Sequence, residues 1–233
     1  NNAYVSAFNW MPDNAHLLVS TVVENRGDAP KKPRAPKGPV TQETAGAEAP
    51  SRTYQDLLEN PYDASLFEYY TTVQLRMVDL SGKQTKVGQP NIIKAFSISP
   101  DGKYILAQTI QKPFSYLVPA SRFPFNYEVW DTNGRLIKEM AKIALDEVRP
   151  KGFDATRLGA RSMTWRADRP ATLYWAEAKD GGDPKVEMAG RDVVYMVDAP
   201  FNATPTKLFA TSLRYSGIQW GDNSRAILNE SWW

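Results

Sequence analysis

The sequence contains no cysteine, which excludes disulfide bonds, a thiol nucleophile and cysteine-ligated zinc. It contains one histidine, His16, whereas zinc sites usually use several His or Cys ligands and a Ser–His–Asp triad needs a His in the right setting. No apolar run approaches the roughly 20 residues of a membrane-spanning helix. An excess of charge is also missing, because 28 Lys and Arg residues balance 26 Asp and Glu residues. We therefore expect no metal, no cofactor, and no nucleic-acid or membrane partner.

The composition is that of a globular protein, with 42% hydrophobic and 23% charged residues in 233. Residues 25–52 depart from it, since they carry five prolines and no aromatic residue. Such a stretch buries too little apolar area to offset the entropy cost of ordering it, so we expect an extended surface insertion. For residues 53–70 we expect two short helical pieces separated before Pro61. The candidate caps are Thr53, Asp56, Asp63 and Ser65.

Four segments of the sequence align without gaps and each predicts a hairpin. They begin at Ala7, Ala95, Ser162 and Gly217. In each, a first strand ends at a large apolar residue, a turn follows, and a second strand is rich in aliphatic or aromatic residues. The large apolar residues are Trp10, Ile98, Trp165 and Trp220, which we expect at equivalent positions in the core between sheets.

Three of these hairpins are followed by a second type, in which an alternating strand ends at Asp79, Asp131 or Asp198. Two hairpins make one four-stranded antiparallel sheet, which is the blade of a β-propeller. The predicted fold is all-β, with about three and a half such blades and with the insertion and helices in the first blade. Because propellers close with about 4–8 blades, we expect residues 1–233 to form a partial propeller domain of a longer protein.

Three parts of the sequence also resemble a known family. Arg122-Phe123-Pro124 followed by Glu128-Val129-Trp130-Asp131 is similar to the propeller of prolyl-oligopeptidase-type serine peptidases. The run from Gly159 to Phe201 and the block from Arg52 to Thr72 resemble the branch that contains the glutamyl endopeptidases of plastids and their bacterial relatives. This resemblance implies a C-terminal α/β-hydrolase domain with a Gly-x-Ser-x-Gly nucleophile, an Asp and a His. The chain has no such motif, so we expect no catalytic residue in it and no peptidase activity from it alone.

The resemblance predicts the non-catalytic propeller part of a serine peptidase, which gates the access of peptide substrates to the hydrolase domain. It is less specific for cleavage after Glu than for the family. The alternative is a stand-alone β-propeller that scaffolds protein partners without enzymatic activity, and a nucleophile motif downstream would distinguish the two. For the location we expect a periplasmic or secreted bacterial protein, with a plastid as the alternative.

Arg122 and Arg161 are the candidate substrate-binding residues. A peptidase that prefers Glu must neutralise a carboxylate, which the arginine guanidinium binds with two parallel hydrogen bonds. The alternative is that both residues pair with Asp or Glu inside the propeller. We expect Asp13, Asp101 and Asp168 to be turn formers, and residues 177–183 to be a solvated loop rather than a calcium site.

Overall fold

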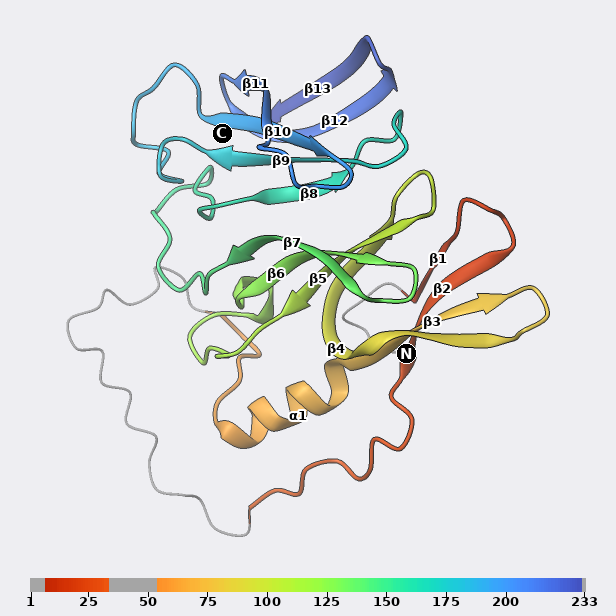
Figure 1. The fold of residues 1–233 in the computed structure, drawn as a ribbon. Helices are drawn as coiled ribbons and strands as arrows, with labels where there is room; N and C mark the ends of the chain where they lie inside the picture. Colours follow the sequence, from red (N-terminus) through yellow and green to blue (C-terminus); the bar gives the residue numbers. More distant parts are fainter. Residues whose placement is uncertain (1–6, 34–53, 232–233) are drawn as a thin grey trace.

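The computed structural model describes residues 7–33 and 54–231, and consecutive antiparallel strands dominate it (Figure 1). Blade 1 consists of β1 (Phe8–Trp10), β2 (His16–Val22), β3 (Thr72–Asp79) and the first part of β4 (Gln84–Ile98). Each strand pairs with the next strand in the chain. The predicted propeller-like, all-β fold is confirmed.

Strand β4 is shared by two blades, which the sequence did not predict. Its residues up to Ile92 pair with β3, and its residues from Ile93 onward pair with β5 (Tyr104–Ile110). Blade 2 is completed by β6 (Phe125–Asp131) and β7 (Leu136–Ile143). The first two blades are therefore one seven-stranded sheet rather than two four-stranded sheets, and Figure 1 shows β4 bending between them.

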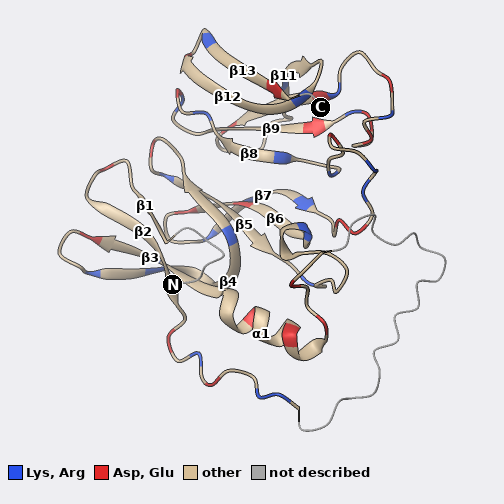
Figure 2. Cartoon of the chain, turned by 180° about the vertical axis from the view of Figure 1, so that it is seen from behind, with Lys and Arg blue, Asp and Glu red and all other residues tan. Residues whose placement is uncertain are grey.

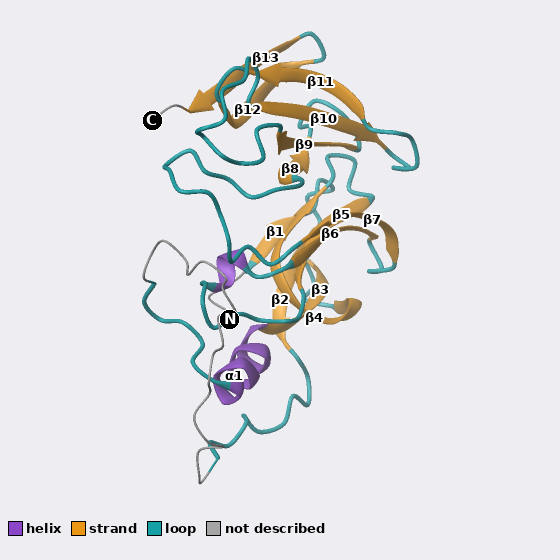
Figure 3. Ribbon diagram, turned by 90° about the vertical axis from the view of Figure 1, so that its left-hand side faces the viewer, coloured by secondary structure: helices purple, strands orange, loops and turns teal. Residues whose placement is uncertain are grey.

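Blade 3 is a separate four-stranded sheet, as predicted. Its strands are β8 (Arg161–Trp165), β9 (Thr172–Ala178), β10 (Asp192–Asp198) and β11 (Thr206–Thr211). A two-stranded sheet follows, formed by β12 (Arg214–Asp222) and β13 (Arg225–Ser231), which we call blade 4. Figure 3 shows the strands of blades 3 and 4 together above the seven-stranded sheet.

One α-helix forms in the region where two were expected, among the residues that the structure describes. Helix α1 (Pro61–Thr71) lies between β2 and β3, and residues 54–60 are not helical. Its cap is Asn60, whose side chain accepts hydrogen bonds from the backbone N–H groups of Tyr62 and Asp63, and not the predicted Asp63 or Ser65. Pro61 is the first residue of the helix. An N–H group at this position has no acceptor within a helix, so proline, which lacks that group, is well suited to start one. Nothing in the described part of the chain is a helix long and apolar enough to cross a membrane.

Three apolar cores lie between successive blades. Blades 1 and 2 enclose Leu18, Leu75 and Ile105, and blades 2 and 3 enclose a larger core around Val129 and Leu173. The third core lies between blades 3 and 4. Because side chains alternate along a strand, each inner sheet contributes to the core on either side of it.

The four aligned apolar residues occupy equivalent places. Ile98, Trp165 and Trp220 all pack toward the preceding blade. Trp10 has the same orientation, since it pairs with Leu17 and faces away from blade 2. The described chain has no blade before the first, so Trp10 is 54% exposed and the expectation of core packing is wrong for it.

Two of the three predicted turn formers, Asp13 and Asp101, bind the backbone of their turns. Asp13 accepts hydrogen bonds from two backbone N–H groups and from the His16 ring, which is exposed. The Asp101 carboxylate accepts from Ser99 and from the backbone of Lys103. Asp168 bonds instead to the Arg166 guanidinium. The His16 ring, at the first residue of β2, is thus bound to the aspartate of the preceding turn.

We predict that Leu173→Ala lowers the free energy of unfolding by about 2–5 kcal/mol, because Leu173 is fully buried in the core between blades 2 and 3. The matched control is Leu158→Ala, whose side chain is 65% exposed and should change stability by under about 0.5 kcal/mol. Urea unfolding followed by tryptophan fluorescence measures both. Equal midpoints for the two variants would contradict the stacking of blades on one another.

Candidate functional site

Arg161, one of the two predicted site residues, belongs to a buried ionic network. It is the first residue of β8, and its side chain is only 12% exposed. Its guanidinium donates to the carboxylate of Asp192 and to the backbone oxygen of Tyr215 at 3.2 Å. Arg161 therefore pairs inside the propeller, as the alternative interpretation expected.

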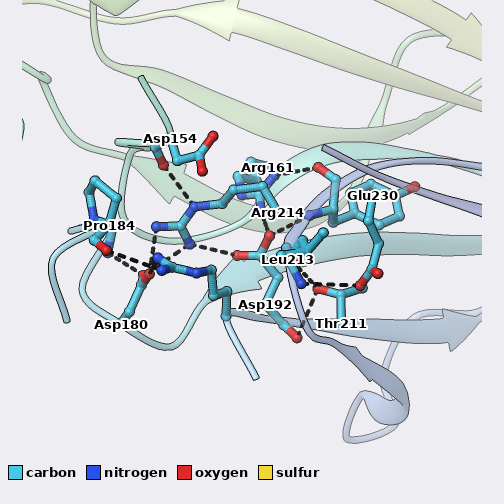
Figure 4. A network of polar contacts seen from close by, with 12 residues as sticks. Asp154, Arg161, Asp180, Pro184, Asp192, Thr211, Leu213, Arg214 and Glu230 are labelled. Atoms are coloured by element: carbon cyan, nitrogen blue, oxygen red, sulfur yellow. Dashed lines mark hydrogen bonds and ion pairs between the residues drawn. The ribbon is translucent and has the colours of Figure 1, made fainter. Parts of the chain in front are cut away.

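Asp180 and Asp192 are the two acceptors at the centre of this network (Figure 4). The Arg214 guanidinium donates to both oxygens of Asp180, at 2.6 and 2.9 Å, and to Asp192 Oδ1 at 3.2 Å. Arg191 lies 3.3 Å from Asp180 Oδ2. The carboxylates are fully buried, and three guanidinium groups compensate their charge.

The network joins blade 3 to blade 4. Asp192 begins β10, Arg214 begins β12, and the Arg214 Nε donates at 2.8 Å to the backbone oxygen of Asp154 in the connection between β7 and β8. Gly182 lies against the same connection, where an added Cβ would approach the Thr156 oxygen to 2.2 Å. This geometry indicates a structural role for the network.

The loop of residues 177–183 therefore differs from the solvated loop that we expected. Asp180 and Gly182 are buried in it, and Asp180 is held by two arginines. Its acidic and glycine-rich sequence is typical of exposed loops, so only the position of Arg191 and Arg214 in space reveals the ionic role. Within residues 7–33 and 54–231, no group of three or more His, Asp or Glu side chains is placed to hold a metal ion.

Arg122, the second predicted residue, lies in different surroundings. It ends a short 3-10 helix, η1 (Ala120–Arg122), and its guanidinium lies 5.3 Å from the centre of the Tyr54 ring. In the described part of the chain its guanidinium has no ion pair or hydrogen bond with another residue.

Two further cations contact Ser121, the residue before Arg122 in the chain. The Lys94 ammonium and the Arg157 guanidinium both donate to the backbone oxygen of Ser121, at 3.3 and 3.1 Å. Both also lie over the ring of Phe125, at 4.2 and 5.1 Å from its centre. We call Lys94, Arg122 and Arg157 the cationic cluster.

The cationic cluster is poor in counter-charge. Asp146 is the carboxylate near it, 3.9 Å from Arg157 and already paired with Arg149. Lys94 has no carboxylate partner among the described residues. Burial, and then the charge of Arg157, lower the pKa of Lys94 from 10.5 to about 8. Burial also lowers the pKa of Arg157, and the negative charge of Asp146 partly offsets this shift. Figure 2 shows that elsewhere blue and red segments alternate over the sheets and loops.

Sequence reasoning missed Lys94 and Arg157. Lys94 lies at a register shift between Ile93 and Ala95, and such an irregularity turns a side chain out of the regular alternation of a strand. Arg157 comes from the connection between β7 and β8. Neither residue lies in a motif, so only the folded chain brings them to the Ser121 oxygen.

Among known proteins, no family model matches the chain. The probable chloroplastic glutamyl endopeptidase of Arabidopsis thaliana is 44% identical over 236 residues, covering 100% of this chain and 24% of that protein. Its counterpart in Oryza sativa subsp. japonica is 43% identical over 235 residues, covering 100% and 25%. The chain thus spans about a quarter of the length of these relatives. The acylaminoacyl peptidase of Pyrococcus horikoshii superposes on 91% of this chain and 26% of its own, with a TM-score of 0.47 and 14% identity.

We predict that Asp192→Asn lowers the free energy of unfolding by about 3–5 kcal/mol, because it leaves Arg161 and Arg214 buried with one carboxylate fewer. The control is Glu68→Gln, which breaks an exposed pair with Lys112 at 2.7 Å and should cost under about 1 kcal/mol. Urea unfolding compares the two. A similar small loss for both would show that the network is not structural.

A second prediction concerns pH. The folded-state pKa of Lys94 lies below its ordinary value, so the unfolded state binds more protons between about pH 8 and 10.5. The cost of burying the charge is therefore present below pH 8 and is removed as the pH rises through this window. Lys94→Met should stabilise the protein at pH 7 and do so much less at pH 10, as urea midpoints would show. Lys138→Met, at an exposed position, is the control. The same gain at both pH values would contradict the burial of this charge.

Proposed function

We propose that the chain belongs to the glutamyl endopeptidase branch of the prolyl-oligopeptidase-type serine peptidases and is the non-catalytic propeller part of a longer serine peptidase. The observation that carries the proposal is the identity of 43–44% over the whole chain with relatives about four times as long. The match to peptidases over a β-blade fold favours this function over a stand-alone scaffold.

Catalysis is assigned to an α/β-hydrolase domain elsewhere in the longer protein. Its serine would attack the peptide carbonyl, its histidine would accept the serine proton and pass it to the leaving amine, and its aspartate would orient the histidine. The propeller would admit peptides and flexible segments to this domain and exclude folded proteins.

The outer faces of the described blades support a larger propeller. Phe8 and Trp10 are each 54% exposed on the face of blade 1 that points away from blade 2, and Ile227 is 63% exposed on blade 4. Exposed apolar faces of this kind are costly in water. Further blades of the longer protein would cover both faces and close the ring.

The named relatives bear on location and substrate. Both are chloroplastic by name, which supports the plastid alternative for this chain, and the bacterial periplasmic or secreted location stays a prediction without support. Their names also support cleavage after Glu. We assign recognition of the substrate carboxylate to Arg122, whose guanidinium is unpaired in the described chain, and no longer favour Arg161, which is bound to Asp192.

The experiment uses the full-length protein and internally quenched peptides that contain Glu. We expect hydrolysis that a serine-directed phosphonate abolishes, faster cleavage of unfolded casein than of a folded protein, and no hydrolysis by residues 1–233 alone. Hydrolysis that resists the phosphonate, or activity of residues 1–233 alone, would overturn the proposal.

We further predict that Arg122→Gln in the full-length enzyme lowers kcat/KM for a Glu peptide by about tenfold to a hundredfold, the value of one desolvated charge-assisted hydrogen bond. A matched Gln peptide should be affected much less, because it places no charge opposite the guanidinium. Arg161→Gln should instead lower stability and affect both peptides alike. Equal losses on both peptides for Arg122→Gln would remove this residue from substrate recognition.

A further inference from the structure

The cationic cluster has the composition of an anion site that the described residues do not neutralise. Lys94 and Arg157 donate to one backbone oxygen, that of Ser121, and therefore lie close together despite their like charges. The Ser121 oxygen is a neutral acceptor, and the Phe125 ring face contributes only its quadrupole. Neither removes the net positive charge.

The buried network around Asp180 and Asp192 differs from the cationic cluster, because its charges are paired. There, three arginines lie against two fully buried carboxylates, so that every guanidinium has a charged partner. At the cationic cluster, Asp146 compensates mainly Arg149, and it lies 3.9 Å from Arg157. Repulsion between half-buried cations persists in a fold only where other contacts hold them or where an anion binds.

We propose that Lys94 and Arg157 act together with Arg122 as the binding site for the carboxylate of a glutamate side chain in the peptide substrate. This inference rests on the proposed function and adds two specificity-determining residues to it. A carboxylate would receive a hydrogen bond from the compact ammonium of Lys94 and up to two from a guanidinium fork.

The three residues have different freedom of movement. Arg157 is held by Ser121 and lies near Asp146, and Lys94 is held by Ser121 on the bend of β4. Among the described residues, the Arg122 guanidinium contacts the Tyr54 ring face. Lys94 and Arg157 would therefore form the fixed part of the site, and Arg122 would close on the bound carboxylate.

The same chemistry has a second source, a carboxylate from the rest of the longer protein. The test separates the two sources, because such an internal partner would stabilise the full-length protein without favouring Glu over Gln in a substrate. It uses the full-length protein and two peptides that differ only by Glu or Gln, in a cleavable form and in a form with a reduced peptide bond for equilibrium binding.

We expect Lys94→Met and Arg157→Gln each to lower kcat/KM for the Glu peptide by about tenfold or more, and that for the Gln peptide by under about threefold. Affinity for the uncleavable Glu peptide should fall by a similar factor. Arg157→Lys keeps the charge and should retain most of the preference for Glu, which separates loss of charge from loss of folding. Lys138→Met, at an exposed position outside the cluster, should change neither quantity.

An unchanged Glu-to-Gln ratio in both variants, or equal losses on the two peptides, would overturn the inference while the peptidase function stands. Absence of hydrolysis in the wild-type protein would instead overturn the proposed function. The uncleavable peptides then decide the inference alone: tighter binding of the Glu form that depends on Lys94 and Arg157 supports it, and equal binding of both forms overturns it.

Discussion

The structure depends on one constraint, that both faces of each inner sheet are apolar and must be covered by another sheet. Strand β9 shows this most directly, since its first five residues are all buried. Leu173 and Trp175 enter the core with blade 2, whereas Tyr174 and Ala176 enter the core with blade 4. Alternation of side chains thus links each core to the next, and the stacking of blades follows from it.

The stacking also decides where charges lie and how they are compensated. Between blades 3 and 4 the arginines meet Asp180 and Asp192 in a network that is buried and paired, and this arrangement joins the two blades. At the end of blade 2, the bend of β4 and the connection between β7 and β8 bring Lys94 and Arg157 to the Ser121 oxygen without an equal number of carboxylates. Paired charges hold the blades together, and unpaired charges form the proposed binding site.

Much of the fold could be predicted because it depends on local patterns. Strands β3, β6 and β10 end at Asp79, Asp131 and Asp198 as predicted, since an Asp followed by a polar turn stops a strand wherever it lies. Two features could not be predicted: the continuity of β4 through both blades and the exposure of Trp10. Both depend on how the sheets are arranged in space, which local sequence patterns do not determine. The site depends on distant contacts even more: Arg122 was found from a sequence block, whereas Lys94, Arg157 and the role of Asp180 required the folded chain.

The central claim is that this chain is part of a propeller in which every blade face is covered. Hydroxyl-radical footprinting of the full-length protein measures this at Trp10, whose side chain is 54% exposed in the described chain, against Phe153, which is 85% exposed. The account predicts that Trp10 in the full-length protein is oxidised about as slowly as the buried Trp165. Phe153 should stay reactive unless another domain covers it. Oxidation of Trp10 at the rate expected for a half-exposed indole would contradict the closed propeller.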